Sequence, residues 1–236
     1  MNIKSQHFLF FIFCFFLSPL SACFAQADVE KIETQNPHVS SPNTQISSAA
    51  ALAQARFVNI QALAAPTLFF DIRYAKDTNF TGKIIYTKEE CYLRKEATAG
   101  LMQAYAAAQK LNPKLTFLIY DCYRPASAQY KLWEVLPDAR YVAPPQKGSR
   151  HSRGMAVDLT LATMDGTPLE MPSGYDTFTK KSHMNYEGKD ISEEAIKNRE
   201  LLKKLMTDAG FTYTRTEWWH FDYPGWQEMP LENIDF

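Results

Sequence analysis

The sequence predicts an α+β fold, a compact single domain in which helices flank a mainly antiparallel sheet. Helix-like and strand-like segments mix along the chain without a regular strand–helix–strand alternation, which argues against a parallel sheet. Length and composition agree, because 236 residues with 46% hydrophobic content fit one ordinary core plus some extra material. The extra material stands at the front, so we expect the folded domain over 52–236.

Residues 1–27 have the pattern of an export signal. After Lys4 comes an apolar run over 8–17, which is short for a transmembrane span and typical of a signal-peptide core. Two alternative processing sites follow. The stretch "AQA" (25–27) suits cleavage that releases a soluble chain, whereas "LSAC" (20–23) resembles a lipobox in which Cys23 is lipidated. With either processing site the mature protein leaves the cytoplasm, and we expect it in the periplasm, soluble or tethered through Cys23.

Residues 28–51 have the composition of a flexible linker. They are rich in Ser, Asn and Gln and show no apolar periodicity. Such a segment cannot bury enough surface to offset the entropy of ordering it. It suits a tether from a lipid anchor as well as an unanchored N-terminus.

The first half of the domain contains three clear elements. An Ala-rich segment with helical periodicity predicts a helix over 95–112, which ends before Pro113. The apolar run "LTFLIYDCY" predicts a buried strand over 115–123. A second helix is expected over 124–136, with Pro125 near its first turn.

The second half continues with a Pro- and Gly-rich loop over 142–154 and a strand over 155–163. The clearest helix is expected over 192–210, where Ser192 is a good N-cap and Gly210 suits the position after the last turn. Aromatic and Thr residues then predict a strand over 211–223.

Charge excludes one class of partner. The net charge is −1 and no run of about five or more basic residues occurs, so nucleic acid is not expected to bind. No protein partner is predicted either.

The cysteines of the mature domain are Cys91 and Cys122. In an exported protein this pair predicts a disulfide, and two buried free thiols are the alternative. Because no CxxC motif is present, a cysteine-type zinc site is not supported.

Two segments suggest a metal site. A catalytic zinc ion needs three nitrogen or oxygen ligands and an open fourth position. The stretch "SRHSRGMAVDLT" supplies His151 and Asp158, with Gly154 allowing a tight turn between them, and "EWWHF" supplies His220. The alternative is that these are solvated or hydrogen-bonded residues of a loop and an aromatic strand.

Glu217 stands three residues before His220 and is a candidate general base for a metal-activated water. On a regular strand the two side chains would face opposite sides. Both reach one site only if the segment bends or if Glu217 lies at the start of the strand.

Four motifs together resemble the zinc D-alanyl-D-alanine dipeptidases of VanX type, which are related to the zinc D,D-carboxypeptidases. The motifs, in chain order, are "DIRYAKDTNFTGK" (71–83), "IYDCYRP" (119–125), "SRHSRGMAVDLT" (149–160) and "EWWHF" (217–221). The resemblance covers roughly 66–223. It implies an α+β domain with zinc at a sheet surface, a fold shared with the hedgehog signalling domain, where zinc does not guarantee catalysis.

The resemblance also implies roles for individual residues. It implies one Zn²⁺ per chain, held by His151, Asp158 and His220, with Glu217 as the catalytic base. Arg124 would stabilise the oxyanion, as suits a permanently charged guanidinium, and its alternative role is that of a helix-start residue paired with Asp121.

Weaker implications concern the substrate. Ser149 and Asp176 fall where the family contacts the substrate ammonium group. Tyr74 lies in the matched motif over 71–83, and we expect its side chain to line the pocket. Tyr86 and His183 are expected to be structural.

The function implied is a zinc metallopeptidase that hydrolyses D-Ala-D-Ala or a similar small D,D-dipeptide. The signal and linker are additions to the cytoplasmic resistance-type enzymes and favour cell-wall dipeptide turnover in the periplasm. The alternatives are a zinc D,D-carboxypeptidase or endopeptidase acting on peptidoglycan stems and a non-catalytic zinc-containing binding module.

Overall fold

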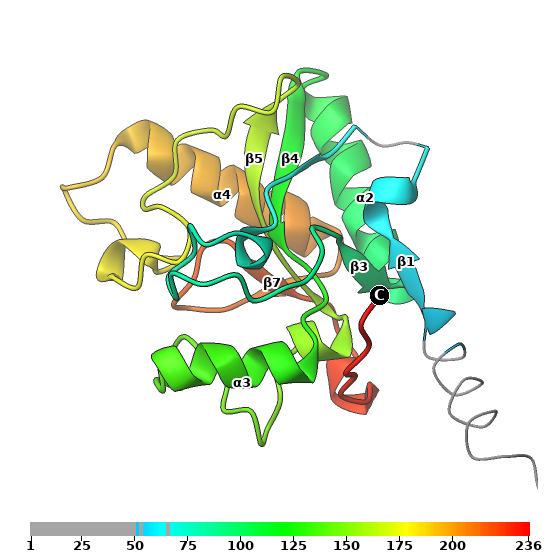
Figure 1. Cartoon of the computed structure of the whole chain (residues 1–236). Helices are drawn as coiled ribbons and strands as arrows, with labels where there is room; N and C mark the ends of the chain where they lie inside the picture. Colours follow the sequence, from blue (N-terminus) through cyan, green and yellow to red (C-terminus); the bar gives the residue numbers. More distant parts are fainter. Residues whose placement is uncertain (1–50, 52–53, 65–66) are drawn as a thin grey trace, which may run out of the picture. The chain divides into compact units, whose positions relative to one another are not determined.

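The computed structural model describes residues 51, 54–64 and 67–236 (Figure 1). The expected signal peptide over 1–27 and nearly all of the expected linker over 28–51 lie outside the described residues. Within the described part of the chain, no helix has both the length and the apolar character that a membrane crossing requires.

The described residues form a mixed arrangement of helices and strands, which confirms the α+β class. The elements follow one another in the order β1 (Phe57–Asn59), β2 (Phe69–Phe70), β3 (Tyr92–Arg94), α2 (Lys95–Leu111), β4 (Leu115–Asp121), α3 (Ala126–Val135), β5 (Ala156–Thr163), α4 (Glu193–Asp208), β6 (Thr212–Tyr213) and β7 (His220–Asp222).

The main sheet has the strand order β2-β4-β5-β7-β6, and β1 pairs with β3 in a separate two-stranded sheet. Only β2 and β4 run parallel, whereas every other pair among the described strands is antiparallel, as predicted. The small β1–β3 sheet was not expected, because strands of three residues are too short to show a periodic pattern.

Helices α2, α3 and α4 begin and end close to the predicted residues. The Ser192 hydroxyl accepts a hydrogen bond from the Ala195 N–H (3.0 Å), so Ser192 is the N-cap of α4. Gly210 follows the end of α4 with φ of 92°, the left-handed conformation that glycine adopts at lowest cost. Pro125 is the cap residue that precedes α3.

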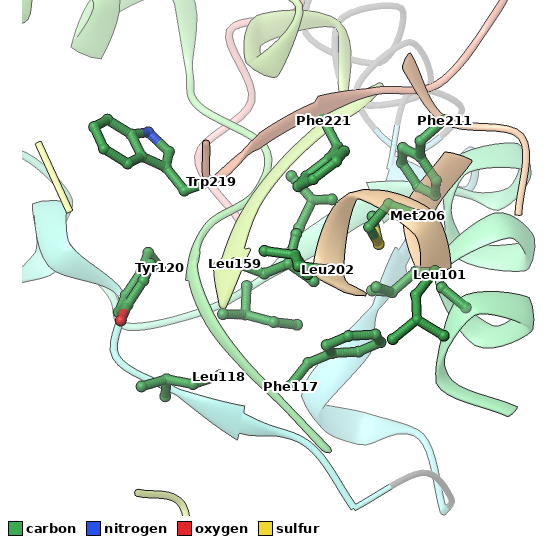
Figure 2. Packing of buried hydrophobic residues seen from close by; sticks show 14 of the residues in the cluster. Leu101, Phe117, Leu118, Tyr120, Leu159, Leu202, Met206, Phe211, Trp219 and Phe221 are labelled. Carbon is green, nitrogen blue, oxygen red and sulfur yellow. The ribbon is translucent and has the colours of Figure 1, made fainter. Parts of the chain in front are cut away.

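One face of the main sheet is closed by α2 and α4. Figure 2 shows Leu101 of α2 and Leu202 and Met206 of α4 packed against Phe117 of β4 and Leu159 of β5. Because side chains alternate along a strand, the neighbours of these residues point to the opposite face. That opposite face carries the polar residues of β5 and β7.

A β-bulge in β4 changes which way its last side chain points. The register with β5 shifts between Ile119 and Asp121, so that Asp121 stands opposite Asp158. Directly opposed residues of an antiparallel pair lie on the same face of a sheet. The bulge therefore turns Asp121 away from the helices and toward the polar face.

The prediction of a single strand over 211–223 was wrong. The segment consists of β6 and β7, which pair with each other and are joined by a turn over 214–219. In that turn the Trp218 N–H donates to the Ser182 carbonyl oxygen (2.8 Å), and its indole N–H donates to the Ser173 hydroxyl (3.0 Å). The aromatic residues thus reflect burial of a turn rather than strand propensity.

We expect Leu202→Ala to lower the free energy of unfolding by about 2–5 kcal/mol, because it leaves a cavity beneath α4. Leu202 is 0% exposed, and Leu111, which is 62% exposed, provides a matched Leu→Ala control. Urea denaturation of both variants measures the difference. Equal losses in the two would contradict the packing described above.

Candidate active site

Three candidate ligands meet on the polar face of the sheet. Their ligand atoms, from His151, Asp158 and His220, all lie within 4.8 Å of one another. The His220 Nδ1 atom is 2.9 Å from Asp158 Oδ1, and the His151 Nε2 atom is 3.1 Å from His220 Nδ1 and 3.3 Å from Asp158 Oδ1. All three side chains are buried. Within the part of the chain that the structure describes, this is the only such cluster.

The fold explains how these three residues meet. Asp158 and His220 are register partners across β5 and β7, so their side chains share one face. His151 begins a short 3₁₀ turn, His151–Arg153, which ends at Gly154 with φ of 68°. A Cβ at Gly154 would also lie 2.3 Å from the Phe57 ring, so glycine is required both by the backbone and by the space.

Each candidate ligand has an outer hydrogen bond that orients it. The His151 Nδ1–H donates to the Cys122 carbonyl oxygen (2.7 Å), and the His220 Nε2–H donates to Asp222 Oδ1 (2.8 Å). Asp158 Oδ2 accepts from the Tyr175 hydroxyl (2.9 Å). With the outer nitrogens held in this way, the inner nitrogens, His151 Nε2 and His220 Nδ1, both face the centre of the cluster, where they are the atoms that a metal ion would bind. Such a centre fits a divalent cation that takes nitrogen and oxygen ligands.

The electrostatics of the cluster favour positive charge. Burial lowers the pKa of the His220 imidazole, but the nearby Asp222 and Asp158 carboxylates outweigh it and raise that pKa well above its usual value. For Asp158 burial raises the carboxyl pKa, and the His151 and His220 imidazoles outweigh it and hold the pKa well below its usual range. A carboxylate that stays ionised while buried is available as an anionic ligand.

Glu217 lies in the turn before β7 and not on the strand itself. The bend lets Glu217 and His220 line the same cleft, which resolves the difficulty of their spacing. Loss of solvation raises the pKa of the Glu217 carboxyl to about 8, against the lowering effect of the His220 charge. A carboxyl with a pKa near neutrality can both take up and return a proton.

Arg124 forms the pair with Asp121 that was considered from the sequence, and it also faces the cleft. Its guanidinium donates to Asp121 Oδ2 (2.6 and 3.1 Å) and to Gln129 Oε1 (2.8 Å), and it also lines the cleft. Asp121 is itself fixed, because Oδ1 accepts from the Tyr86 hydroxyl (2.7 Å). Tyr86 therefore supports the Asp121–Arg124 pair, which agrees with the structural role expected for it.

The cleft has a cavity volume of about 380 Å³ and contains all the other candidate site residues. Ser149 accepts a hydrogen bond from the His151 N–H (3.2 Å) through its hydroxyl. Tyr74 donates its hydroxyl to Asp176 (3.1 Å), whose φ of 56° places a non-glycine residue in the left-handed region. Burial and the neighbouring Asp158 and Glu217 carboxylates raise the pKa of Asp176 well above its usual value.

An aromatic wall closes one side of the cleft. It consists of Phe80, Tyr141 and Phe178, which come from three separate loops. The ring centroids of Phe178 lie 4.8 Å from Tyr141 and 5.2 Å from Phe80. Single aromatic residues in loops give no sequence signal of such a wall.

The supporting residues of the cluster were also missed from the sequence. Asp222 could have been found, because it is two residues after His220 and shares its face on a strand. Tyr175 offered no signal, since it lies in an irregular segment next to Asp176. His183 lies at the end of a 3₁₀ turn outside the cluster, in agreement with the structural role expected for it.

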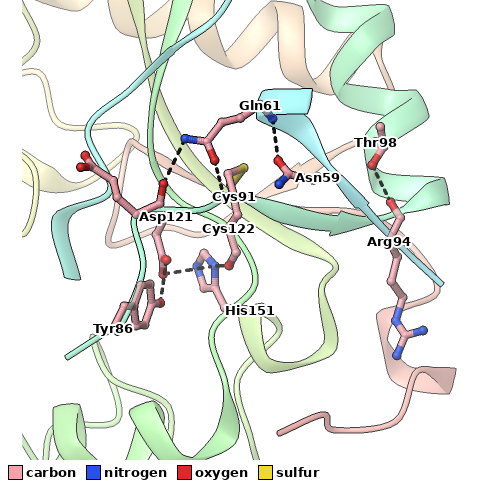
Figure 3. The surroundings of a disulfide bond; sticks show 10 residues. Asn59, Gln61, Tyr86, Cys91, Arg94, Thr98, Asp121, Cys122 and His151 are labelled. Atoms are coloured by element: carbon pink, nitrogen blue, oxygen red, sulfur yellow. Dashed lines mark hydrogen bonds and ion pairs between the residues drawn. A yellow bond between two sulfur atoms is a disulfide. The ribbon is translucent and has the colours of Figure 1, made fainter. Parts of the chain in front are cut away.

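The structure contains a disulfide between Cys91 and Cys122, with a Cα–Cα distance of 5.3 Å (Figure 3). Both cysteines are buried. Cys122 directly follows β4, and Cys91 directly precedes β3, so the bond joins two loop residues at the ends of these strands.

A buried His–Asp–His donor set beside a free carboxyl and a guanidinium is the arrangement of a metal-dependent hydrolase. The chain belongs to the Peptidase_M15 family, described as D-ala-D-ala dipeptidase, whose sequence model matches residues 53–234.

The chain is also similar to individual proteins. The chain is 40% identical over 166 residues to a D-alanyl-D-alanine dipeptidase of Escherichia coli K12. This alignment covers 70% of this chain and 84% of the relative. The chain is 32% identical over 176 residues to a D-alanyl-D-alanine dipeptidase of Enterococcus faecalis. This second alignment covers 64% of this chain and 84% of that relative. A solved VanY D,D-pentapeptidase mutant in complex with Zn(II) is 15% identical, with a TM-score of 0.36, over 60% of this chain and 78% of that chain.

We expect Asp222→Ala to weaken zinc binding by about 10–100-fold, because His220 would lose the partner that fixes its ring and tautomer. Competition titration against a chromophoric chelator measures the dissociation constant. Asp208→Ala is the control, since Asp208 is exposed and pairs only with Lys204 on α4. The same zinc affinity in both variants would refute the orienting role of Asp222.

Proposed function

We propose that this protein is a zinc metallopeptidase that hydrolyses D-Ala-D-Ala, a D,D-dipeptidase of cell-wall dipeptide turnover. The observation that carries the proposal is the meeting of the His151, Asp158 and His220 donors with Glu217 and Arg124 in one cleft of about 380 Å³. Family membership supplies the reaction class, and a cleft of this size suits a small substrate.

The metal centre would hold one zinc ion per chain. His151, Asp158 and His220 would supply three ligands, which is the number that catalytic zinc sites take from the protein. When bound, zinc supplies Lewis-acid polarisation and makes hydroxide available near neutral pH. The outer hydrogen bonds to Cys122, Asp222 and Tyr175 keep the ligands in the orientation that binding requires.

Glu217 would carry the proton during hydrolysis. Its carboxylate takes a proton from the attacking water and returns it to the nitrogen of the leaving D-alanine as the amide bond breaks. The products are two molecules of D-alanine, so water, proton and leaving amine balance without another reactant. The position of Glu217 in the turn before β7 places the carboxyl in the cleft beside His220.

Arg124 would stabilise the negative charge that develops on the carbonyl oxygen. Asp121 and Gln129 hold its guanidinium on two sides, so little reorganisation is needed when that charge appears. The Tyr74 ring lies 4.9 Å from the guanidinium carbon and covers one face of it.

Substrate recognition would use Ser149, Asp176 and Tyr74. A free dipeptide carries an ammonium group close to its scissile bond, whereas a peptidoglycan stem does not. Asp176 offers a carboxyl for such an ammonium in the same cleft as the donor set, and Tyr74 fixes its direction. This supports the dipeptidase over a D,D-carboxypeptidase or endopeptidase that acts on stems.

We place the mature protein in the periplasm, either soluble or tethered by a lipidated Cys23. The signal-like pattern of residues 1–27 supports export, and a disulfide in the folded domain suits an oxidising compartment. Cell fractionation together with the mass of the mature N-terminus distinguishes lipidation from plain cleavage, and a cytoplasmic chain that keeps residues 1–27 would refute export.

We expect the zinc-loaded protein to release D-alanine from D-Ala-D-Ala but not from a pentapeptide stem. Replacement of Glu217 by glutamine preserves shape and removes the base, and it should lower kcat by about 100–10,000-fold. A D-alanine assay with both substrates in parallel measures this. Turnover of the stem would instead identify a carboxypeptidase, and inactivity of a zinc-bound chain on both substrates would favour a non-catalytic module.

We also expect Arg124→Ala to lower kcat by about 100–1,000-fold while zinc remains bound, because one donor to the oxyanion is lost. Arg140→Ala is a suitable control, since Arg140 also lines the cleft but is itself exposed and pairs with Asp138. Steady-state kinetics and zinc content are measured on both. Turnover of Arg124→Ala equal to that of the control would exclude the role in catalysis.

A further inference from the structure

The disulfide lies immediately behind the candidate metal centre. Its residue Cys122 provides the carbonyl oxygen that accepts the hydrogen bond from His151 Nδ1–H (2.7 Å) (Figure 3). A carbonyl oxygen can only accept, so this bond places the proton on Nδ1 and leaves the Nε2 lone pair for the metal. The position of the Cys122 backbone therefore determines both the tautomer and the direction of the His151 ring.

The regular part of the fold does not extend to Cys122. Strand β4 ends at Asp121, just beyond its bulge, and α3 begins only at Ala126. The next two residues each donate one backbone hydrogen bond, from the Tyr123 N–H to the Tyr92 oxygen (2.9 Å) and from the Arg124 N–H to the His151 oxygen (3.2 Å), and their side chains make further hydrogen bonds. The disulfide is the covalent attachment in this short segment.

Cys91, at the other end of the bond, is firmly held. Its carbonyl oxygen accepts from the Ile60 N–H (2.9 Å), and its N–H donates to Gln61 Oε1 (3.1 Å). Gln61 is fixed in turn, because its side-chain amide donates to the Glu89 oxygen (3.1 Å) and its N–H donates to Asn59 Oδ1 (3.0 Å). The disulfide thus connects the loop beside His151 to a well-anchored turn outside the main sheet.

Residues close to Cys122 in the sequence also contribute to the candidate active site, so the position of this segment affects more than His151. Asp121 comes directly before Cys122 and has Oδ2 3.5 Å from His151 Nδ1, and Arg124 is two residues after Cys122. A displacement of this segment would move the carbonyl that orients His151 together with the ion pair that lines the cleft. The disulfide is therefore placed where it bears on the site and not only on the stability of the fold.

We infer that the Cys91–Cys122 disulfide is a positioning element of the metal centre, which fixes the Cys122 carbonyl against His151 and so raises the affinity for zinc. The inference rests on the proposed zinc-binding role of His151. A disulfide that merely restricts the unfolded chain would stabilise the domain and leave the zinc affinity of the folded state unchanged.

The test compares the oxidised full chain with Cys91→Ala/Cys122→Ala, which has no thiol to bind the metal. Competition against a chromophoric chelator, well below the melting temperature of each protein, should give a zinc dissociation constant about 10–100-fold higher in the double variant. The absorption spectrum of the cobalt-substituted protein should shift as well, because it reports the geometry of the ligands. Leu202→Ala is the matched control, expected to melt earlier with unchanged zinc affinity.

The outcomes separate the two proposals. Equal zinc affinity in the double variant and the wild-type chain overturns the positioning role, whereas failure of the wild-type chain to bind zinc overturns the proposed metal centre instead. If the double variant does not fold, Gln61→Ala takes its place, since it keeps the disulfide and frees the Cys91 N–H. Its zinc affinity should fall in the same direction, and unchanged affinity there also overturns the inference.

Discussion

Asp158 and His220 face each other where β5 pairs with β7, and this register puts two of the three candidate metal ligands on one face of the sheet. A slip of one residue in this register would turn His220 toward the helices and replace it in the cluster by an apolar neighbour. The slip would also move the apolar side chains of Val157 and Phe221, which are register partners on the other face, to the polar face. Their burial in the core therefore prevents it. Packing beneath α2 and α4 therefore fixes the geometry of the candidate active site.

A polar face that is buried must satisfy its own hydrogen bonds and charges. The carboxylate of Asp121 does this with Arg124 and Tyr86, and the bulge in β4 is what brings it to the correct side. Removal of one partner from such a network would leave an uncompensated charge away from water. The residues around the cluster are thus coupled, and the same hydrogen bonds that satisfy them also orient the candidate ligands.

The sequence could predict the parts of the fold that depend on local patterns. The helices over 95–112 and 192–210 have strong periodicity and capping residues, and they are present nearly as expected. The strand over 211–223 failed because buried aromatic residues of a turn have the same composition as a strand. In the site, sequence motifs predicted His151, Asp158 and His220 as ligands. Tyr175 and the Cys122 carbonyl contact these residues only in the tertiary structure, so no pattern in the sequence indicates them.

The distance along the chain between the three donors bears on when the site forms during folding. His220 is 62 residues beyond Asp158 and 69 beyond His151, and α4 lies between them. Pairing β7 with β5 therefore closes a long loop, whose entropic cost makes such contacts slow to form. We expect a newly made chain to acquire its helices and the β4–β5 pair first, and to gain metal affinity and hydrolytic activity together when the last strand docks.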